Sequence, residues 1–162
     1  MRHFTLCLLL ALVVAVSPLR AQAPAADIQK IDGLLAASKY TATRITTNIR
    51  NPNAAVWRIP LKGESIGEFE IRVTAQSGML ITFVTVAAKK NIRRTADLVE
   101  KVLALNNDLD YVKVGFDNDS DAFVRVDAFL RTVDVQQMND ILQQVGNSAD
   151  RLHATLKPSL IP

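Results

Sequence analysis

Residues 68–87, which read EFEIRVTAQSGMLITFVTVA, decide the fold of this chain. Residues 68–75 alternate between apolar and polar side chains, as a strand with one buried face does. Gln76-Ser77-Gly78 is a turn signal. Residues 79–87 are apolar almost throughout, which predicts a central strand that is covered on both of its faces. The stretch therefore predicts a hairpin at the centre of an antiparallel sheet.

Further strands and helices are predicted on both sides of this hairpin. Strand patterns occur at residues 43–50, 55–61, 111–116 and 122–130, and helical patterns at residues 27–38, after Thr95 and after Asp134. Pro60 lacks a backbone N–H, so its strand should lie at an edge or be irregular there. Strand runs that alternate with helices and are joined by short turns indicate an α+β domain. We expect an antiparallel sheet flanked by helices in the order α-β-β-β-α-β-β-α, with residues 43–50 as an additional weak strand.

The last predicted helix carries a regular apolar stripe. Asp134 is its expected N-cap, and Gln137 completes a capping box. The stripe consists of Val135, Met138, Leu142, Val145, Ala149, Leu152 and Leu156. Such a stripe either covers the sheet of its own domain or forms a seam with another helix. In the second alternative, the face of a homodimer or partner complex is formed by Met138, Leu142, Val145 and Leu152.

The N-terminus has the parts of a secretory signal peptide. Arg2 and His3 precede an uncharged apolar run at residues 6–16, and small residues follow at positions 21–26. This pattern predicts a signal peptide over residues 1–23 that is cleaved between residues 21 and 26. The run is shorter than the roughly 20 apolar residues of a membrane-spanning helix, although an uncleaved anchor remains an alternative. We therefore expect a periplasmic or secreted protein with no membrane span after removal of the signal.

Loss of this leader changes what the composition implies. The only cysteine, Cys7, lies inside the leader, so the remaining chain has no disulfide and no thiol ligand or nucleophile. Removing Arg2 and Arg20 brings the 19 Lys and Arg to within one of the 16 Asp and Glu. Such a near-neutral chain gives no reason to expect a nucleic-acid partner. Residues 27–157 are then the right length for a single domain.

The order of elements and one stretch of sequence resemble a known family. Leu-Asn-Asn at residues 105–107, the strand-loop-strand sequence YVKVGFDNDSDAFVRVD at 111–127 and Leu-Arg-Thr at 130–132 look like the YbjN family. That family is similar in fold to the chaperones of type III secretion. The resemblance implies a non-enzymatic, often dimeric α+β module that binds another protein or peptide.

Four cations precede the helix that Thr95 caps: Lys89, Lys90, Arg93 and Arg94. The N-terminus of a helix is already partly positive, so an anion or an acidic partner would be stabilised there. The alternative is a solvated loop without a ligand. These four residues, called the basic segment below, are the predicted contact for an anion or partner.

The remaining polar clusters offer no catalytic or metal motif. Residues 117–121 (Asp-Asn-Asp-Ser-Asp) suit either a hairpin loop or a weak calcium site, but the spacing lacks the Gly and Glu of a helix-loop-helix calcium loop. His153 has no second histidine or cysteine beside it in the mature chain, and no Gly-x-Ser-x-Gly motif is present. We expect no cofactor, no metal and no enzymatic activity. The sequence predicts an exported protein-binding module, and the alternative is a regulatory module that senses a small ligand or anion.

Overall fold

The computed structural model describes residues 25–45 and 55–161. The predicted signal peptide and the second half of the predicted strand at residues 43–50 lie outside these ranges. The helices are α1 (Ala25–Ala37), α2 (Ala96–Asp108) and α3 (Val135–Leu156). The strands are β1 (Thr43–Ile45), β2 (Val56–Lys62), β3 (Glu68–Gln76), β4 (Met79–Ala87), β5 (Lys113–Phe116) and β6 (Ala122–Phe129).

The strands form one six-stranded sheet in the order β1-β2-β3-β4-β6-β5, in which all neighbours are antiparallel. The prediction of an antiparallel α+β fold is confirmed, and the weak strand joins the sheet as β1. The central hairpin turns at Ser77 and Gly78, whose φ angles are 51° and 76°. Two successive positive φ values match the twist of paired strands, and glycine adopts them without a steric penalty. This turn fixes the β3–β4 register.

Pro60 lies where β2 has only one neighbour in the described part of the chain. It is opposite Glu70 of β3, whereas β1 pairs with β2 only as far as Arg58. On the side of β2 that faces β1, no described strand pairs with Pro60. Its missing N–H therefore removes no hydrogen bond from the β1–β2 ladder. Strand β2 as a whole lies between β1 and β3, so the predicted edge position holds only locally, at Pro60.

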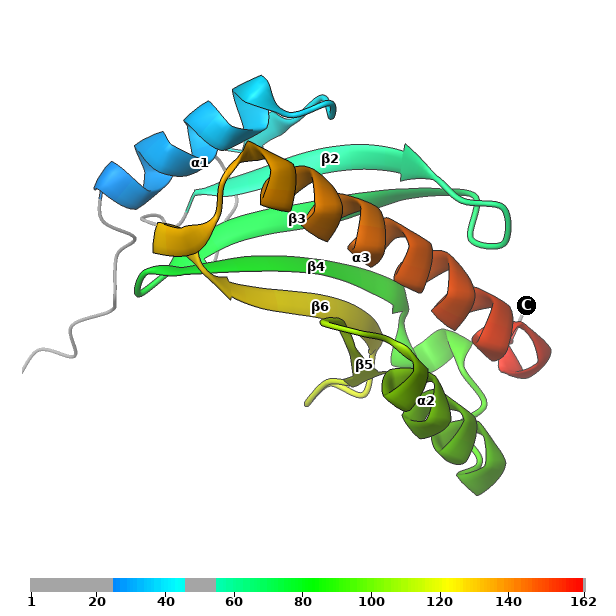
Figure 1. Cartoon of the computed structure of the whole chain (residues 1–162). Helices are drawn as coiled ribbons and strands as arrows, with labels where there is room; N and C mark the ends of the chain where they lie inside the picture. The colour runs from blue at the N-terminus through cyan, green and yellow to red at the C-terminus, as the bar shows by residue number, and fades with distance from the viewer. Residues whose placement is uncertain (1–24, 46–54, 162) are drawn as a thin grey trace, which may run out of the picture.

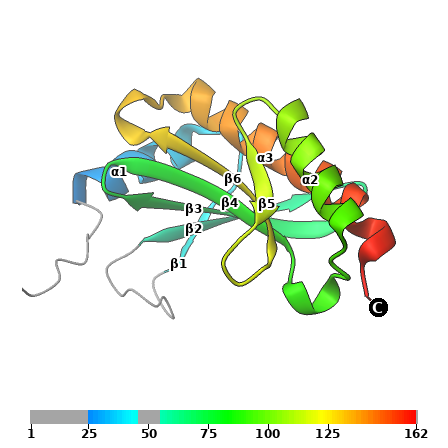
Figure 2. The same ribbon diagram turned by 90° about the horizontal axis from the view of Figure 1, so that it is seen from below.

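The three α-helices lie on one face of the sheet, called the inner face here. Figure 1 shows α3 running diagonally across the strands, with α1 beside its first turns and α2 beside its C-terminal end. In Figure 2 the helices gather on one side of the sheet, and no described α-helix covers the opposite side, called the outer face. The sheet therefore has one covered face and one open face.

Helix α3 begins at the predicted cap and buries its apolar stripe on the sheet. The backbone N–H of Gln137 donates to Asp134 Oδ1 at 2.8 Å, and the Asp134 N–H donates to Gln137 Oε1 at 3.4 Å, which completes the capping box. The stripe residues named for a partner face are fully buried within the single chain: Met138, Leu142, Val145 and Leu152. While α3 stays docked, these side chains have no surface to offer a second helix. The dimer-seam alternative for this stripe is set aside in favour of packing on the chain's own sheet.

Candidate functional site

Apolar side chains run along the middle of the open outer face. They are Met79, Ile81 and Phe83 of β4, together with Phe129 opposite Met79 and Phe123 opposite Thr85. All except Phe129 are half-buried, and Phe129 is 57% exposed. An antiparallel sheet that faces water normally presents polar side chains there. These five residues, called the apolar column, are apolar surface without a cover in the described part of the chain.

The sequence predicted a cover on both faces of this central strand. The structure covers only its inner face, where Leu80 and Val84 are buried beneath the helices. The apolar outer positions of β4 thus have no partner among the described elements. An uncovered apolar stripe rimmed by charge is a common mark of an interaction site.

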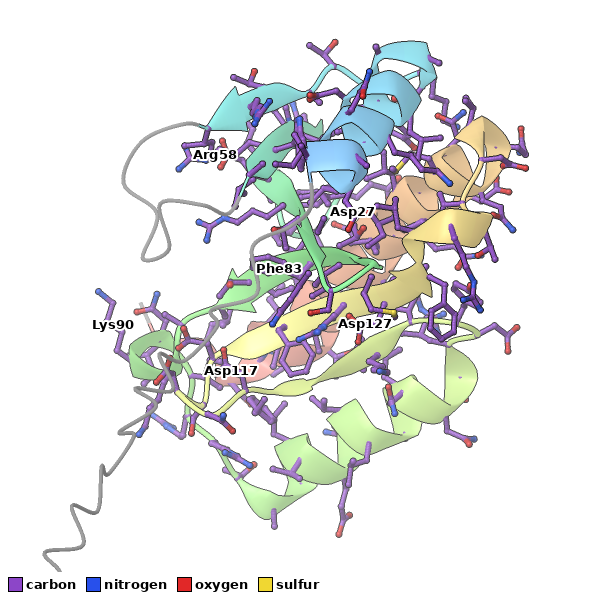
Figure 3. All side chains as sticks on the ribbon, turned by 90° about the vertical axis from the view of Figure 1, so that its left-hand side faces the viewer. Asp27, Arg58, Phe83, Lys90, Asp117 and Asp127 are labelled. Atoms are coloured by element: carbon purple, nitrogen blue, oxygen red, sulfur yellow. The ribbon has the colours of Figure 1, made fainter. Side chains whose placement is uncertain are left out.

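A row of cations crosses the apolar column at Phe83. In the sheet register, Arg58 lies opposite Arg72, Arg72 opposite Phe83, Phe83 opposite Arg125, and Arg125 opposite Lys113. Figure 3 places Arg58, Phe83 and Asp127 on successive parts of this face. Like charges directly opposite each other on paired strands destabilise a sheet. The four basic residues, called the cation row, therefore weaken the fold unless carboxylates compensate for them.

Carboxylates of the chain compensate only part of the cation row. Arg58 Nε lies 3.5 Å from Glu70 Oε2, and Asp127 accepts hydrogen bonds from Arg125 at 2.6 Å and from Lys113 at 3.2 Å. Arg72 has no ion pair within the described residues, and its guanidinium carbon lies 5.9 Å from the centre of the Phe83 ring. Arg72 is thus an exposed cation beside the half-buried ring of Phe83, which leaves it available to an external carboxylate.

Asp127 is held in its charged form by this arrangement. Burial raises the pKa of its carboxyl group, but the hydrogen bonds and positive charges of Arg125 and Lys113 outweigh burial and hold the pKa below its usual value. The carboxylate consequently stays ionised in mildly acidic solution.

Asp127→Asn is expected to reduce the acid sensitivity of folding. Because the pKa is lower in the folded chain, the carboxylate stabilises the fold above about pH 4, and this contribution is lost as the pH falls through the folded pKa. Urea unfolding from about pH 7 to about pH 2.5 should show a steeper loss of unfolding free energy for the native chain, by up to about 1 kcal/mol. Parallel curves for the two proteins would contradict this role.

The basic segment is exposed and lies away from the cation row. Lys89 and Lys90 are in the short 3-10 turn Lys89–Asn91, and the backbone of Arg93 donates to Ser159 O at 2.8 Å. Arg94 stacks on the ring of Phe116 at 4.4 Å from its centre. None of the four cations forms an ion pair with another described residue. At the start of α2, the Thr95 hydroxyl already accepts from the Leu98 N–H at 3.2 Å, as expected for a cap.

The acidic loop at residues 117–121 uses its oxygens in the turn itself. Asp117 Oδ1 accepts from the N–H groups of Asp119 and Asp121 at 3.0 and 2.9 Å, and Ser120 has a φ of 65°. Asp121 Oδ1 accepts from the Lys89 N–H at 2.8 Å, which joins the loop to the basic segment (Figure 3 labels Asp117 and Lys90). Within the described ranges, no three His, Cys, Asp or Glu residues are grouped as metal ligands. These contacts are those of a hairpin loop, which was one of the two alternatives for this segment.

His153 lies within hydrogen-bond distance of a serine, but the carboxylate beside this pair, Asp150, is not placed as in a catalytic triad. Ser65 Oγ lies 2.9 Å from His153 Nδ1. Asp150 Oδ1 accepts instead from the backbone N–H groups of Ser65 and Ile66, at 2.8 and 3.0 Å. A triad needs the carboxylate on the second imidazole nitrogen. The cluster instead fastens the β2–β3 loop to α3.

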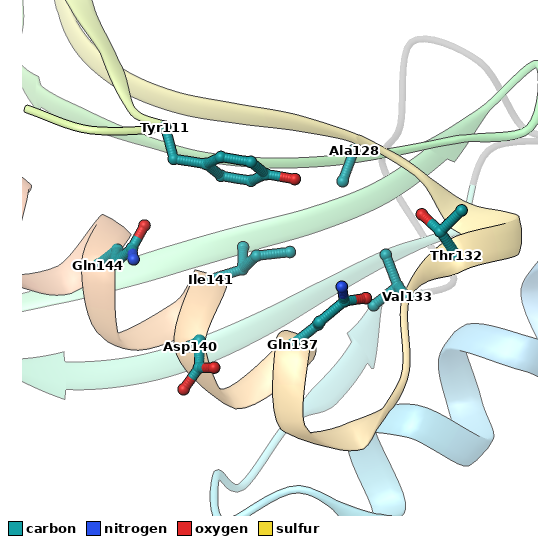
Figure 4. Close-up of a pocket in the computed structure, with 8 residues that line it drawn as sticks. All are labelled: Tyr111, Ala128, Thr132, Val133, Gln137, Asp140, Ile141 and Gln144. Atoms are coloured by element: carbon teal, nitrogen blue, oxygen red, sulfur yellow. The ribbon is translucent and has the colours of Figure 1, made fainter.

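Tyr111 partly covers a small pocket that the sequence gave no reason to expect. Figure 4 shows its ring over a cavity of about 200 Å³ between the β5 side of the sheet and α3. The cavity is lined by Tyr111, Ala128, Thr132, Val133, Gln137, Asp140, Ile141 and Gln144. Tyr111 is 68% exposed and has a φ of 71°, which is unfavourable for a side chain with a Cβ atom. An exposed ring on a strained backbone contributes little to stability.

Tyr111→Gly is expected to be more stable than Tyr111→Ala by about 1 kcal/mol, because both lose the ring but only glycine relieves the left-handed backbone. Urea unfolding of the two variants measures this difference. Ala104→Gly, at an exposed position within α2, is the matched control and should lose about 1 kcal/mol. Equal stability of the two Tyr111 variants would show that the backbone is not strained there.

No helix in the described part of the chain is both long and apolar enough to cross a membrane. The outer face, the basic segment and the Tyr111 pocket are the candidate surfaces for binding within the described part of the chain. Of these, the outer face combines apolar area with unbalanced charge and is the strongest candidate site.

The chain matches the model of the YbjN family, described as "Putative bacterial sensory transduction regulator", over residues 27–158. No curated protein matches it. Among solved structures, it is similar to a chain of the heterodimeric ExoU–SpcU complex from the type III secretion system of Pseudomonas aeruginosa. The identity is 16% and the TM-score 0.48, with 63% of this chain and 84% of that chain covered. A chain of the ExsC–ExsE complex is similar at 11% identity and a TM-score of 0.46, with 79% and 94% covered.

Proposed function

Because the chain belongs to the YbjN family, we propose that it is a non-enzymatic module that binds another protein or peptide through the outer face of its sheet. The family's description as a regulator of sensory transduction fits a protein that acts by binding. The observation that carries the proposal is the apolar column on β4 and β6, which no described element covers.

Burial of this column supplies the driving force for docking. Removing apolar surface from water contributes roughly 25 cal/mol per Å². Stable protein interfaces bury about 800 Å² on each partner. The charged groups of the cation row, which crosses the column at Phe83, set the orientation of the partner rather than the bulk of the affinity.

Site-specific photo-crosslinking in the producing cell tests this docking face. A photoreactive phenylalanine analogue replaces Phe83 in one chain and Leu103, an apolar residue exposed on α2, in a control chain. We expect a discrete adduct with another protein from position 83 and none from position 103. Adducts from position 103 alone, or from neither position, would refute docking on the outer face.

We propose that the protein acts in the periplasm or cell envelope. The support is the basic start, the short apolar run and the small residues of the first 26 positions. Mass spectrometry of the protein purified from cells should find a new N-terminus between residues 21 and 26, and fractionation should recover it outside the cytoplasm. An intact Met1 in a cytoplasmic fraction would contradict export.

A homodimer, if formed, uses a surface other than the stripe of α3, since that stripe is buried in the single chain. Light scattering on the purified protein gives its mass directly. A dimer that survives Leu103→Lys but separates on Phe83→Lys would identify a second copy as one occupant of the outer face.

The alternative function is sensing of a small anion by the basic segment, favoured by four exposed cations without ion pairs among the described residues. Titration with inorganic phosphate should then raise the melting temperature of the native chain. The same titration should not affect a variant in which Lys89, Lys90, Arg93 and Arg94 are replaced by Gln. An unchanged melting temperature of the native chain would remove this alternative.

A further inference from the structure

We infer that the element which docks on the outer face is an acidic amphipathic helix of the partner, lying along β4 between the two halves of the cation row. This inference rests on the docking function proposed above and adds the chemistry and shape of the occupant. It is carried by two observations together, the apolar column and the register of the cations on both sides of it.

The length of the apolar column corresponds to a short helix. Its two ends lie at the β4 positions Met79, opposite Phe129, and Thr85, opposite Phe123. At about 3.3 Å per strand residue these ends are roughly 20 Å apart. A helix rises about 1.5 Å per residue, so about 13 residues, or nearly four turns, span the column. The apolar stripe of such a helix can contact the whole column.

The width of the site also corresponds to a helix. Neighbouring strands are about 4.8 Å apart, so Arg72 on β3 and Arg125 on β6 flank Phe83 of the column at about that distance on either side. Arg58 and Lys113 lie one strand further out. A helix is about 10 Å across with its side chains, so residues beside its apolar stripe reach outward over these cations. Carboxylates at those flanking positions would meet arginine on both sides.

The charges favour acidic flanks. The cation row places Arg58 opposite Arg72 and Arg125 opposite Lys113, and Arg72 has no carboxylate within the described residues. An external carboxylate would relieve the contact between Arg58 and Arg72 by pairing with Arg72, and Arg–carboxylate hydrogen bonds are strong and directional. Basic flanks on the partner would add further like-charge contacts, which disfavours such partners.

The same charges favour a polypeptide over a polyphosphate chain. Glu70 and Asp127 lie beside the cation row, at 3.5 Å from Arg58 and 2.6 Å from Arg125, and would repel an unbroken line of phosphates. The apolar column also needs apolar side chains to displace its water. An amphipathic helix provides apolar side chains for the column on one face. It carries its acidic side chains beside that face, as separate charges and not as an unbroken line. The inner face of the sheet is already covered in this way by the amphipathic α3.

A peptide library tests the inference directly. Yeast-displayed helical peptides of about 14 residues, with a fixed apolar stripe and random flanking positions, are selected on the protein as purified from cells expressing the full chain. We expect enriched peptides to carry Asp and Glu at the flanks. Their affinity should fall at least about tenfold for Arg72→Glu and for Arg125→Glu. It should be unchanged for Arg93→Glu, an equal charge reversal on the basic segment, and should weaken with added salt.

The outcomes separate this inference from the proposed function. Enriched peptides with neutral or basic flanks, or equal affinity for native and Arg72→Glu chains, would overturn the acidic helix. If binding is nevertheless lost in Phe83→Lys, docking on the outer face stands. Peptides that bind Phe83→Lys as tightly as the native chain would overturn both ideas. Competition by oligo-dT or by anionic lipid vesicles, with no selected helix bound, would replace the peptide by a phosphate-bearing partner.

Discussion

Leu142→Lys is expected to unfold the chain rather than to separate a dimer. Leu142 is fully buried in the single chain and lies in the middle of the stripe by which α3 packs on the sheet. Truncation of a buried leucine to alanine alone costs about 2–5 kcal/mol. A buried ammonium group adds a large desolvation cost. Together these losses match or exceed the roughly 5–15 kcal/mol that stabilise an ordinary domain.

Circular dichroism and urea unfolding measure the result. The Leu142→Lys chain should lack a cooperative unfolding transition, whereas Leu142→Ala should keep a transition at a lower urea concentration. Ala154→Lys introduces the same side chain at an exposed position of α3 and should leave stability within about 0.5 kcal/mol of the native value. A folded Leu142→Lys chain with half the native mass in solution would show instead that the stripe is a dimer seam.

Gly63→Ala is expected to cost about 2–3 kcal/mol, far more than a substitution in a surface loop usually does. A Cβ atom at Gly63 would overlap Asp150 Oδ1 and would lie 2.8 Å from Ile66 Cγ2. Asp150 Oδ1 accepts the N–H groups of Ser65 and Ile66 and so holds the β2–β3 loop against α3. Displacing a carboxylate from two such bonds costs about the energy of charged hydrogen bonds.

A double-mutant cycle in urea unfolding tests this mechanism. Asp150→Ala alone should cost about 2 kcal/mol, and Gly63→Ala should cost clearly less in that background, because the bonds it disrupts are already absent. Gly33→Ala is the matched control, since nothing lies within 4 Å of its added Cβ atom. In helix α1 that change should stabilise the chain by up to about 1 kcal/mol. Additive effects of Gly63→Ala and Asp150→Ala would contradict the proposed contact.

Much of the fold could be predicted because the deciding patterns are local. The apolar run at residues 79–87 indicated a central strand, and β4 is flanked by β3 and β6. The stripe of α3 and its Asp134 cap are spacings of three and four residues along one helix, so they are visible without knowing any contact. The family suggested by residues 105–132 is confirmed by the match over residues 27–158.

The candidate site could not be predicted because it depends on register between strands. The cation row comes from four different strands: Arg58, Arg72, Arg125 and Lys113. Within each strand, the alternation of apolar and polar residues shows only that these side chains point outward. A shift of one residue in any pairing would move the whole strand to the other face, so the row exists only once each register is known. The apolar outer side of β4 is visible in the sequence, but it predicts a second covering layer that the described part of the chain does not contain.

The basic segment and the Tyr111 pocket differ in how visible they are in the sequence. The charges at residues 89–94 are adjacent in the sequence and therefore conspicuous, and among the described residues the Phe116 ring and the acidic turn lie against them. Tyr111 was read only as the start of a strand, because nothing in the sequence shows that a tyrosine has a positive φ. Local strain of this kind depends on how the chain enters β5 after α2.

The one-sided layering also has a consequence for the order in which the chain can fold. The inner face of the sheet is covered chiefly by α3, which occupies residues 135–156, near the end of the polypeptide. During synthesis at about 5–20 residues per second, all six strands leave the ribosome before their main cover exists. A chain stopped before Val135 should therefore remain unfolded. For the export proposed here this timing is an advantage, because a nascent chain that lacks its final helix cannot fold prematurely and remains flexible enough to thread through a translocation channel.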